Sequence, residues 1–167
     1  MNRELLGLIV IWFLTGLIGC ATLPTQPYVA KFKVIESDGR FVAHENGTVG
    51  DMKTGLVWAS KDNGEDINWQ DAKRYCQNYR GGGYTDWRMA TQDELAELYD
   101  QSEGYQVTQK NYNVHLTELI ELSACCPWAS ETRVSGAAIF GFGGGRRGWY
   151  DRSGSDGGRA LPVRGGN

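Results

Sequence analysis

The chain has 167 residues and a formal net charge of -3, and residues of hydrophobic type make up 41% of it, which fits one globular domain. Four cysteines, two histidines and 22% charged residues exclude a disulfide-dense miniprotein, a histidine-built metal enzyme and an acidic disordered tail. Glycine is unevenly spread. Of the 23 glycines, 11 lie between Thr132 and Asn167, so we expect loops and tight turns in that part.

The first residues predict an export signal. Arg3 precedes an apolar stretch over residues 5–18, which as a helix would reach about 21 Å, short of the roughly 30 Å hydrocarbon core of a membrane. This favours a secretory signal peptide over residues 1–19. The run ends on Leu17-Ile18-Gly19-Cys20, which resembles a bacterial lipobox, so Cys20 is the predicted lipid-bearing N-terminus. The alternative is an ordinary signal peptide with a cysteine there by chance.

Lipidation implies an envelope protein whose first partner is the membrane. Several acyl chains anchor firmly, because each buried methylene contributes about 0.8 kcal/mol. Ala21 is not acidic, and an Asp at that position usually retains bacterial lipoproteins in the inner membrane, so we expect the outer membrane. Residues 20–30 are expected to be the lipidated cysteine and a tether, and residues 31–167 a single domain.

The first half of that domain is expected to begin with strands. Phe32 and Val34 indicate a short first strand. The segment 40–60 has a β pattern in which Glu45-Asn46-Gly47 predicts a hairpin closed by a type I′ turn. A third strand is expected over residues 56–58, with Trp58 buried.

Two helices with explicit start signals follow. Asn68 with Asp71 resembles a capping box, and an apolar face follows it until the glycines at 81–83. Thr91 with Glu94 matches the capping box more closely and predicts a short helix over residues 92–100.

Short motifs occur in one order along residues 40–166. They are GTV (47–49) before Asp51, KTGLVW (53–58), WQDA (69–72) leading to YC (75–76), GYTDWR (83–88), Thr91 with EL (94–95), WAS (128–130) and PVRGG (162–166). Together they resemble the Lcl C-terminal domain family of bacterial secreted or surface domains. The resemblance implies an α+β, C-type-lectin-like fold: two helices packed on small antiparallel sheets with long glycine-rich loops. Some family members are implicated in adhesion and in binding sulfated polysaccharides.

The chain departs from the family pattern at two places. Ala90 stands where the family usually has a proline before the threonine, which loosens the turn but leaves the cap at Thr91. Many members carry a cysteine near the final Val-Arg, suited to pair with the helix cysteine, and here there is none. We therefore expect Cys76 to pair with Cys125 or Cys126; a vicinal bridge between Cys125 and Cys126 is the alternative.

The sequence gives little indication of catalytic or metal-binding chemistry. His44 and His115 have no nucleophile motif around them, so both are predicted to be surface or packing residues. The loop 62–66 has oxygen donors but lacks the length and closing Glu of an EF-hand, so Ca²⁺ is possible there but not indicated, and no cofactor is expected. Four acids on the second helix are interpreted as a solvated face rather than as paired carboxylates or Ca²⁺ ligands: Asp93, Glu94, Glu97 and Asp100.

The C-terminal part carries the candidate ligand site. A buried strand is expected over residues 137–142 and a loop at 143–145; a phosphate cradle there is excluded, because no Lys-Ser/Thr or helix start follows. Six arginines against Asp151 and Asp156 give residues 132–167 a local charge of +4. The guanidinium group of arginine can bind sulfate or carboxylate through two hydrogen bonds, and exposed aromatic rings can stack on sugars. The expected ligand is therefore an anionic polysaccharide. The candidate residues are Arg146, Arg147, Trp149, Tyr150 and Arg152.

An alternative places Trp149 and Tyr150 in the core, with Arg88 and Arg164 in internal salt bridges. Nucleic acid is not expected as a partner, because the predicted location is the envelope and the chain is acidic overall. The preferred function is a non-enzymatic, lectin-like binding or adhesion lipoprotein. The alternatives are a cysteine-dependent enzyme related to the formylglycine-generating sulfatase modifiers, and a structural lipoprotein with a protein partner.

Overall fold

The computed structural model describes residues 32–107 and 112–166. The predictions for residues 1–31, which include the signal peptide, Cys20 and the tether, lie outside the described residues. Within the described part, no helix is long and apolar enough to cross a membrane.

Over residues 32–107 and 112–166 the fold is α+β, with two α-helices and three sheets. The helices are α1 (Trp69–Asn78) and α2 (Gln92–Leu98), and a short 3-10 turn, η1, covers Gly81–Gly83. The strands are β1 (Val34–Ser37), β2 (Phe41–His44), β3 (Thr48–Asp51), β4 (Val57–Ala59), β5 (Arg88–Met89), β6 (Tyr105–Val107), β7 (Tyr112–Val114), β8 (Cys126–Thr132), β9 (Gly136–Gly141), β10 (Arg146–Asp151), β11 (Gly158–Arg159) and β12 (Pro162–Arg164).

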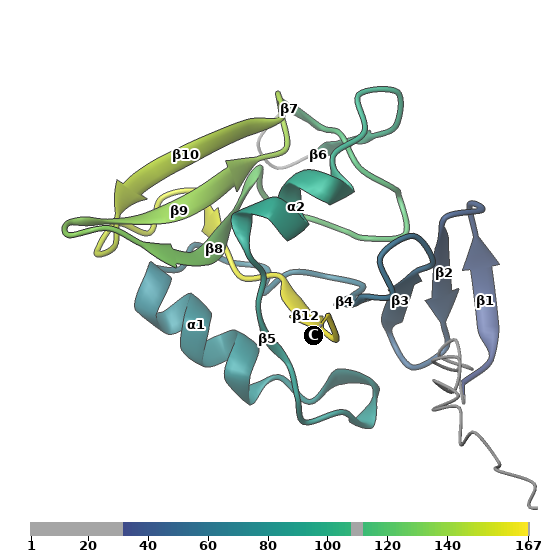
Figure 1. Ribbon diagram of the computed structural model, residues 1–167. Coiled ribbons are helices and arrows are strands. Elements are labelled where there is room, and N and C mark those ends of the chain that lie inside the picture. The colour runs from purple at the N-terminus through teal and green to yellow at the C-terminus, as the bar shows by residue number, and fades with distance from the viewer. Residues whose placement is uncertain (1–31, 108–111, 167) are drawn as a thin grey trace, which may run out of the picture.

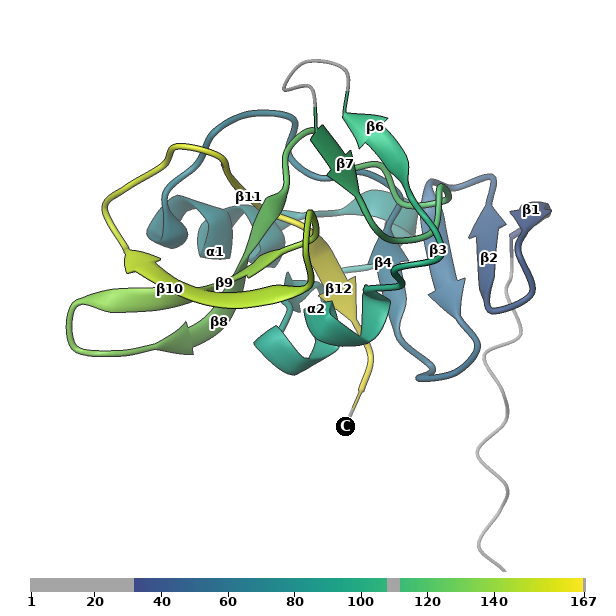
Figure 2. The same cartoon turned by 90° about the horizontal axis from the view of Figure 1, so that it is seen from above.

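The largest sheet has the strand order β1-β2-β3-β4-β12-β5, so a strand from the C-terminal end completes a sheet that begins near residue 34. A second sheet has the order β10-β9-β8-β11, and β6 pairs with β7 alone. Figures 1 and 2 show β1 at one end of the molecule and β10 at the other. The strands of these sheets pair antiparallel, except that β11 pairs with β8 in parallel. The expectation of antiparallel sheets is therefore wrong for this one pair.

The β2–β3 hairpin forms where the sequence predicts it, but its turn is of another kind. His44 pairs with Thr48, which leaves a three-residue loop, and the Gly47 N–H donates to the His44 carbonyl at 3.0 Å. Gly47 has φ 76° at the end of that loop. A type I turn followed by a glycine in the left-handed region is the usual geometry of a three-residue hairpin loop, so the expected two-residue type I′ turn is wrong.

Both helix starts are confirmed. The Asn68 side chain accepts from the Asp71 N–H at 3.0 Å, and Thr91 and Glu94 make the full reciprocal capping box. Each helix ends earlier than expected: α1 stops before η1, in which Gly82 and Gly83 have positive φ, and α2 stops at Leu98. The caps depend on neighbours three residues apart, which explains why the sequence predicts them well.

The core lies between the sheets and the helices. α1 packs against β5, β12 and β8, while α2 packs against β8 and β9. Trp58 is fully buried, as expected, and lies in the main cluster with α2 residues Leu95 and Leu98. A second cluster joins one face of α1 to β8 and β9; its buried members are Trp69, Ala72, Cys76, Met89, Trp128, Ala137, Ile139 and Ala160.

Candidate binding site

Strand β10 divides the arginine and aromatic residues between two faces. Successive side chains on a strand point to opposite sides, so Arg146 and Tyr150 share one face and Arg147 and Trp149 share the other. The pairing of β10 with β9 keeps its register from Arg146 to Asp151, so the alternation is not interrupted by a bulge. The predicted ligand residues therefore cannot act as one continuous patch.

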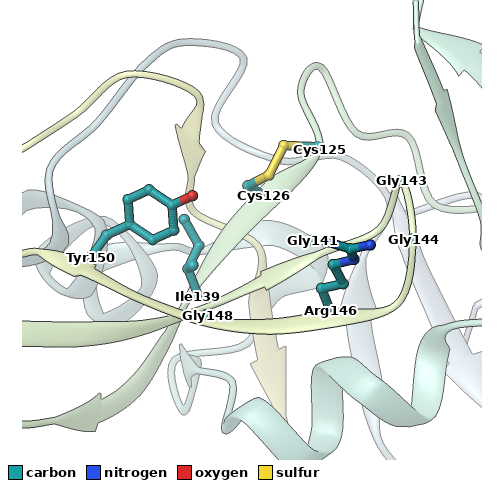
Figure 3. Close-up of a pocket in the computed structure, with 9 residues that line it drawn as sticks. All are labelled: Cys125, Cys126, Ile139, Gly141, Gly143, Gly144, Arg146, Gly148 and Tyr150. Carbon is teal, nitrogen blue, oxygen red and sulfur yellow. A yellow bond between two sulfur atoms is a disulfide. The ribbon is translucent and has the colours of Figure 1, made fainter.

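A pocket of about 430 Å³ opens on the face that carries Arg146 and Tyr150 (Figure 3). Its remaining side chains are Ile139 and the joined Cys125 and Cys126. The rest of the lining is glycine, namely Gly141, Gly143, Gly144 and Gly148. The absence of side chains at these four positions keeps this side of the sheet open.

A second pocket of about 370 Å³ continues on the other side of Tyr150. It shares Cys125, Cys126, Ile139 and Tyr150 with the first pocket, so we treat the two as lobes of one β10 groove. The second lobe adds Trp128, Asp151, Gly154, Asp156 and Gly157. The first lobe therefore carries a cation, and the second carries two carboxylates.

The two charged ends of the β10 groove differ in how their side chains are held. The Arg146 side chain is exposed and makes no hydrogen bond or ion pair with the described residues. In the second lobe, the hydroxyl and backbone N–H of Ser153 donate to Asp151 at 2.6 and 2.8 Å and lower its pKa. Asp151 therefore stays charged well into the acid range, whereas the Arg146 guanidinium is free to bind an added anion.

Gly148 makes room for Tyr150 in the middle of the β10 groove. A Cβ at position 148 would lie 3.1 Å from Cγ2 of Ile139 and 3.3 Å from Cε2 of Tyr150. On the far face, the Gln92 side-chain amide donates to the Ile139 and Gly148 carbonyls at 2.9 and 3.1 Å. Gln92 thus ties α2 to both strands of the groove floor. Sequence analysis missed this role, because the partners lie far along the chain.

The cysteine pairing differs from the favoured prediction. Cys125 and Cys126 are bonded to each other, and Cys76 is a buried free cysteine. The vicinal alternative is therefore the pairing in the structure, and the favoured pairing of Cys76 with either of them is wrong. Burial raises the pKa of the Cys76 thiol to about 12, so it stays protonated and unreactive at neutral pH.

The side chains on the opposite face of β10 contact other parts of the fold. Arg147 forms an ion pair with Asp93 of α2. Trp149 is half-buried against the main core, and the Arg133 guanidinium lies 3.7 Å from its ring centroid. The alternative that put both rings in the core is therefore met only in part, because Trp149 packs against the core without being enclosed by it, and Tyr150 is 63% exposed. Arg147 and Trp149 do not line the β10 groove.

Arg152 lies outside the groove as well. Its guanidinium donates to the Val134 carbonyl at 3.2 Å, and it lines a separate pocket of about 590 Å³ beside the start of α1. The two arginines that the alternative placed in salt bridges are both paired with carboxylates. Arg164 binds Asp86 at 2.8 and 2.9 Å, and Arg88 pairs with Glu94 on α2 at 2.6 Å. Of the six arginines in residues 132–167, Arg147, Arg159 and Arg164 have a carboxylate partner, so about half of the local positive charge is matched within the fold.

Arg159, at the end of β11, has a structural role that the sequence did not indicate. It is buried, and it donates to Asp66 at 2.5 Å and to the Ser123 hydroxyl at 2.6 Å. Asp62 is buried 3.7 Å from it and also accepts from the Ser123 and Gly64 N–H groups, both at 2.8 Å. The Asp62 carboxylate is therefore occupied, so a Ca²⁺ ion in the loop 62–66 would have to displace these donors.

The four acidic residues considered as paired carboxylates or Ca²⁺ ligands each bind a neighbouring side chain. Asp93 and Glu94 pair with arginines, Glu97 with Lys53 at 2.6 Å, and Asp100 accepts from Ser102. Burial raises the pKa of Glu94, but hydrogen bonds from Arg88 and Thr91 outweigh it and leave that pKa lowered. Over residues 32–107 and 112–166, no group of three or more His, Cys, Asp or Glu side chains could hold a metal ion.

Neither histidine lines the β10 groove. His44 is buried in β2, at the end of the molecule opposite β10 (Figure 1). The His115 backbone N–H donates to the Phe142 carbonyl, and the Phe142 N–H donates to the Cys125 carbonyl, so the His115 backbone lies near the groove. Its imidazole Nδ1 atom lies 3.0 Å from the Glu103 carbonyl oxygen.

The family model of the Lcl C-terminal domain matches residues 47–164, which is most of the described chain. No curated protein matches the chain at a significant level. The match runs from the loop of the β2–β3 hairpin to the end of β12, so it includes α1, α2, the vicinal cysteines and the whole β10 groove. The chain belongs to the Lcl C-terminal domain family.

Proposed function

We propose that this chain is a non-enzymatic, lectin-like binding or adhesion module that holds an anionic polysaccharide in the β10 groove. The observation that carries the proposal is the Arg146 guanidinium, which has no partner among the described residues and lines the same open face as the exposed ring of Tyr150, four residues farther along β10. A guanidinium binds sulfate or carboxylate through two parallel hydrogen bonds, and an aromatic ring offers an apolar surface to the C–H face of a sugar.

The arrangement suits a surface-bound polymer better than a small enclosed ligand. The groove is open, glycine lines much of its first lobe, and it has two lobes along one strand. Ligand sites usually combine an apolar surface with a few placed polar groups, which is the composition of this groove. The C-type-lectin-like assignment is part of the proposal, and it is supported by two helices packed against small sheets with long connecting loops.

Display from a bacterial envelope completes the proposal. A lipid on Cys20 would hold the domain near the outer membrane, with residues 20–30 as the tether. This would keep the groove available to a polymer at that surface. A protein partner is the competing idea, and it is supported by the exposed Val34 and Ile35 on the edge strand β1.

The competing enzymatic function would use Cys125 or Cys126 as a nucleophile. A thiolate is the reactive form of cysteine, and in the structure both sulfur atoms are bonded to each other. Thiol titration of the folded chain tests this: a reactive, low-pKa thiol at either position would support the enzyme. A folded chain in which neither residue reacts until a reductant is added would support the binding module.

The binding proposal is tested with the full-length chain in detergent on immobilised heparin, a sulfated polysaccharide, and on a glycan array. We expect the wild type to be retained and the Arg146→Ala variant to bind about tenfold more weakly, because a charge-assisted hydrogen bond contributes about 1.5–3 kcal/mol. Tyr150→Ala should also weaken binding. No retention of the wild type, or retention unchanged in both variants, would refute the proposal.

A further inference from the structure

The Cys125–Cys126 disulfide lies where the two lobes of the β10 groove meet. Both lobes are lined by the two cysteines together with Ile139 and Tyr150. Figure 3 shows the disulfide and the Tyr150 side chain as separate elements around the same opening, with Arg146 farther along the strand. The disulfide therefore flanks the path of a ligand that extends along β10 from Arg146 to Tyr150.

We propose that the Cys125–Cys126 disulfide is an apolar contact surface for the ligand in the β10 groove, so that the oxidised form binds more tightly than the reduced form. The inference rests on the proposed binding function and names a further specificity-determining element of that site. The ligand it selects is a sugar chain that places an anionic group at Arg146 and the C–H face of a ring between Tyr150 and the disulfide.

The chemistry of the disulfide fits this role. Bonding neighbouring cysteines closes a small ring that includes the peptide bond between them, so both sulfurs are held together without freely rotating side chains. The sulfurs are polarizable and weakly solvated, and like Ile139 they lose little on leaving water. Two separate thiols would each regain rotational freedom, which an incoming ligand would have to restrict.

The backbone on either side ties the disulfide to both walls of the groove. The Cys125 carbonyl accepts from the Phe142 N–H at 2.9 Å, at the end of β9 where the glycine loop of the first lobe begins. Cys126 starts β8 and pairs with Gly158 of β11, next to Gly157 of the second lobe. Breaking the S–S bond frees the two residues that anchor these walls, so the reduced form should hold both lobes less firmly.

The reduction is a two-electron step with a simple balance. A dithiol reductant such as dithiothreitol supplies two electrons and two protons. The Cys125–Cys126 bond breaks to give two thiols, while the reductant closes its own disulfide. Cys76 already carries a thiol and is buried away from the solvent, so it does not take part.

The test compares heparin binding by the full-length chain in four forms: oxidised, reduced with dithiothreitol, reoxidised, and carrying Cys125→Ala with Cys126→Ala. We expect binding about fivefold weaker in the reduced and double-alanine forms, and full recovery on reoxidation. In the reduced form the ligand must restrict two freely rotating thiols, and in the double-alanine form both sulfur atoms are missing from the surface that the ligand would cover. The dependence of binding on salt should stay as in the oxidised form, because no charge is removed. Cys76→Ala is the matched control and should bind like the wild type.

The outcomes separate this inference from the proposed function. If the oxidised chain binds and Arg146→Ala weakens it while the reduced form still binds equally well, the disulfide is no part of the site and the inference is wrong. If the oxidised chain does not bind heparin at all, the proposed function fails and the inference fails with it. Circular dichroism of each form distinguishes a change in the groove from unfolding; recovery on reoxidation supports the inference even if the double variant is unstable.

Discussion

Arg146 and Arg147 are neighbours in the sequence and lie on opposite faces of β10. Arg146 faces the groove beside the disulfide and has no partner among the described residues, whereas Arg147 is paired with Asp93 on α2. A basic pair that looks like one ligand site in the sequence is therefore one candidate contact and one surface ion pair.

This difference makes Arg147→Ala a matched control for Arg146→Ala, because both variants remove one positive charge. We expect Arg147→Ala to change heparin affinity by less than about twofold and the free energy of unfolding by less than about 1 kcal/mol, as is usual for exposed ion pairs. Affinity chromatography and urea unfolding measure the two quantities. An equal loss of affinity in both variants would mean that heparin responds to net charge and not to the groove.

The carboxylates of the second lobe should oppose a uniformly polyanionic ligand. Asp156 is exposed and lines that lobe, so Asp156→Asn should strengthen heparin binding by about twofold through reduced repulsion, and high salt should remove the difference. Isothermal titration at two salt concentrations measures the effect. Glu36→Gln makes the same change of charge on β1, at the far end of the molecule, and is expected to have no effect. Equal gains in both variants would refute a role for the second lobe.

The buried Arg159 should be among the most important polar residues for stability. Arg159→Met would leave Asp62 buried without its cation and Ser123 without a partner for its hydroxyl oxygen, at a cost of about 3–5 kcal/mol in unfolding free energy. Adding Asp62→Asn to Arg159→Met should recover part of that loss. Chemical denaturation measures both. Arg74→Ala, which breaks an exposed pair with Asp71, should cost less than about 1 kcal/mol; a similar cost for Arg159→Met would contradict the prediction.

Asp51 should make stability depend on pH in the acid range. Burial raises its pKa, but hydrogen bonds from Arg40 at 2.9 and 2.7 Å and from Thr54 at 2.8 Å outweigh burial and leave the pKa lowered. A lowered folded-state pKa adds stability that is fully present above the unfolded value, about 3.9, and is lost as the pH falls through the folded value.

Urea unfolding between pH 7 and pH 2 measures this dependence. We expect the wild type to lose unfolding free energy more steeply below about pH 4 than the Asp51→Asn variant, which lacks the titrating group. Asp51→Asn should also be less stable than the wild type at pH 7. Glu118→Gln changes an exposed carboxyl and should follow the wild-type curve. Identical pH slopes in the wild type and Asp51→Asn would show that this ion pair does not govern acid stability.

The lipid anchor predicts a modification at one cysteine. The wild type should incorporate labelled palmitate when expressed in a bacterium, and Cys20→Ala should not, because the lipidated sulfur is absent. Cys76→Ala, whose cysteine is buried in the fold, should be labelled like the wild type. Labelling of Cys20→Ala would show that the lipobox prediction is wrong.

The sequence by itself determined the features that depend on near neighbours or on simple patterning. The caps at Asn68 and Thr91 form because each side chain meets a backbone N–H three residues away, and the ordered family motifs identify the domain. The β2–β3 hairpin is also placed correctly, although its loop is one residue longer than a type I′ turn allows. Burial of Trp58 follows from its place in an apolar strand.

Only the tertiary structure decided which residues meet across long stretches of chain. The sequence alone cannot decide whether Cys76 forms a disulfide. In the fold, Cys76 lies on α1 in the core, whereas Cys125 and Cys126 are bonded to each other at the groove. Asp66 and Arg159 are 93 positions apart and meet only because β11 pairs with β8 beside the loop that carries Asp66. The residue types indicate which ligands a site could bind. Only the strand geometry of β10 and its unbroken register with β9 show that Arg146 and Tyr150 share a face.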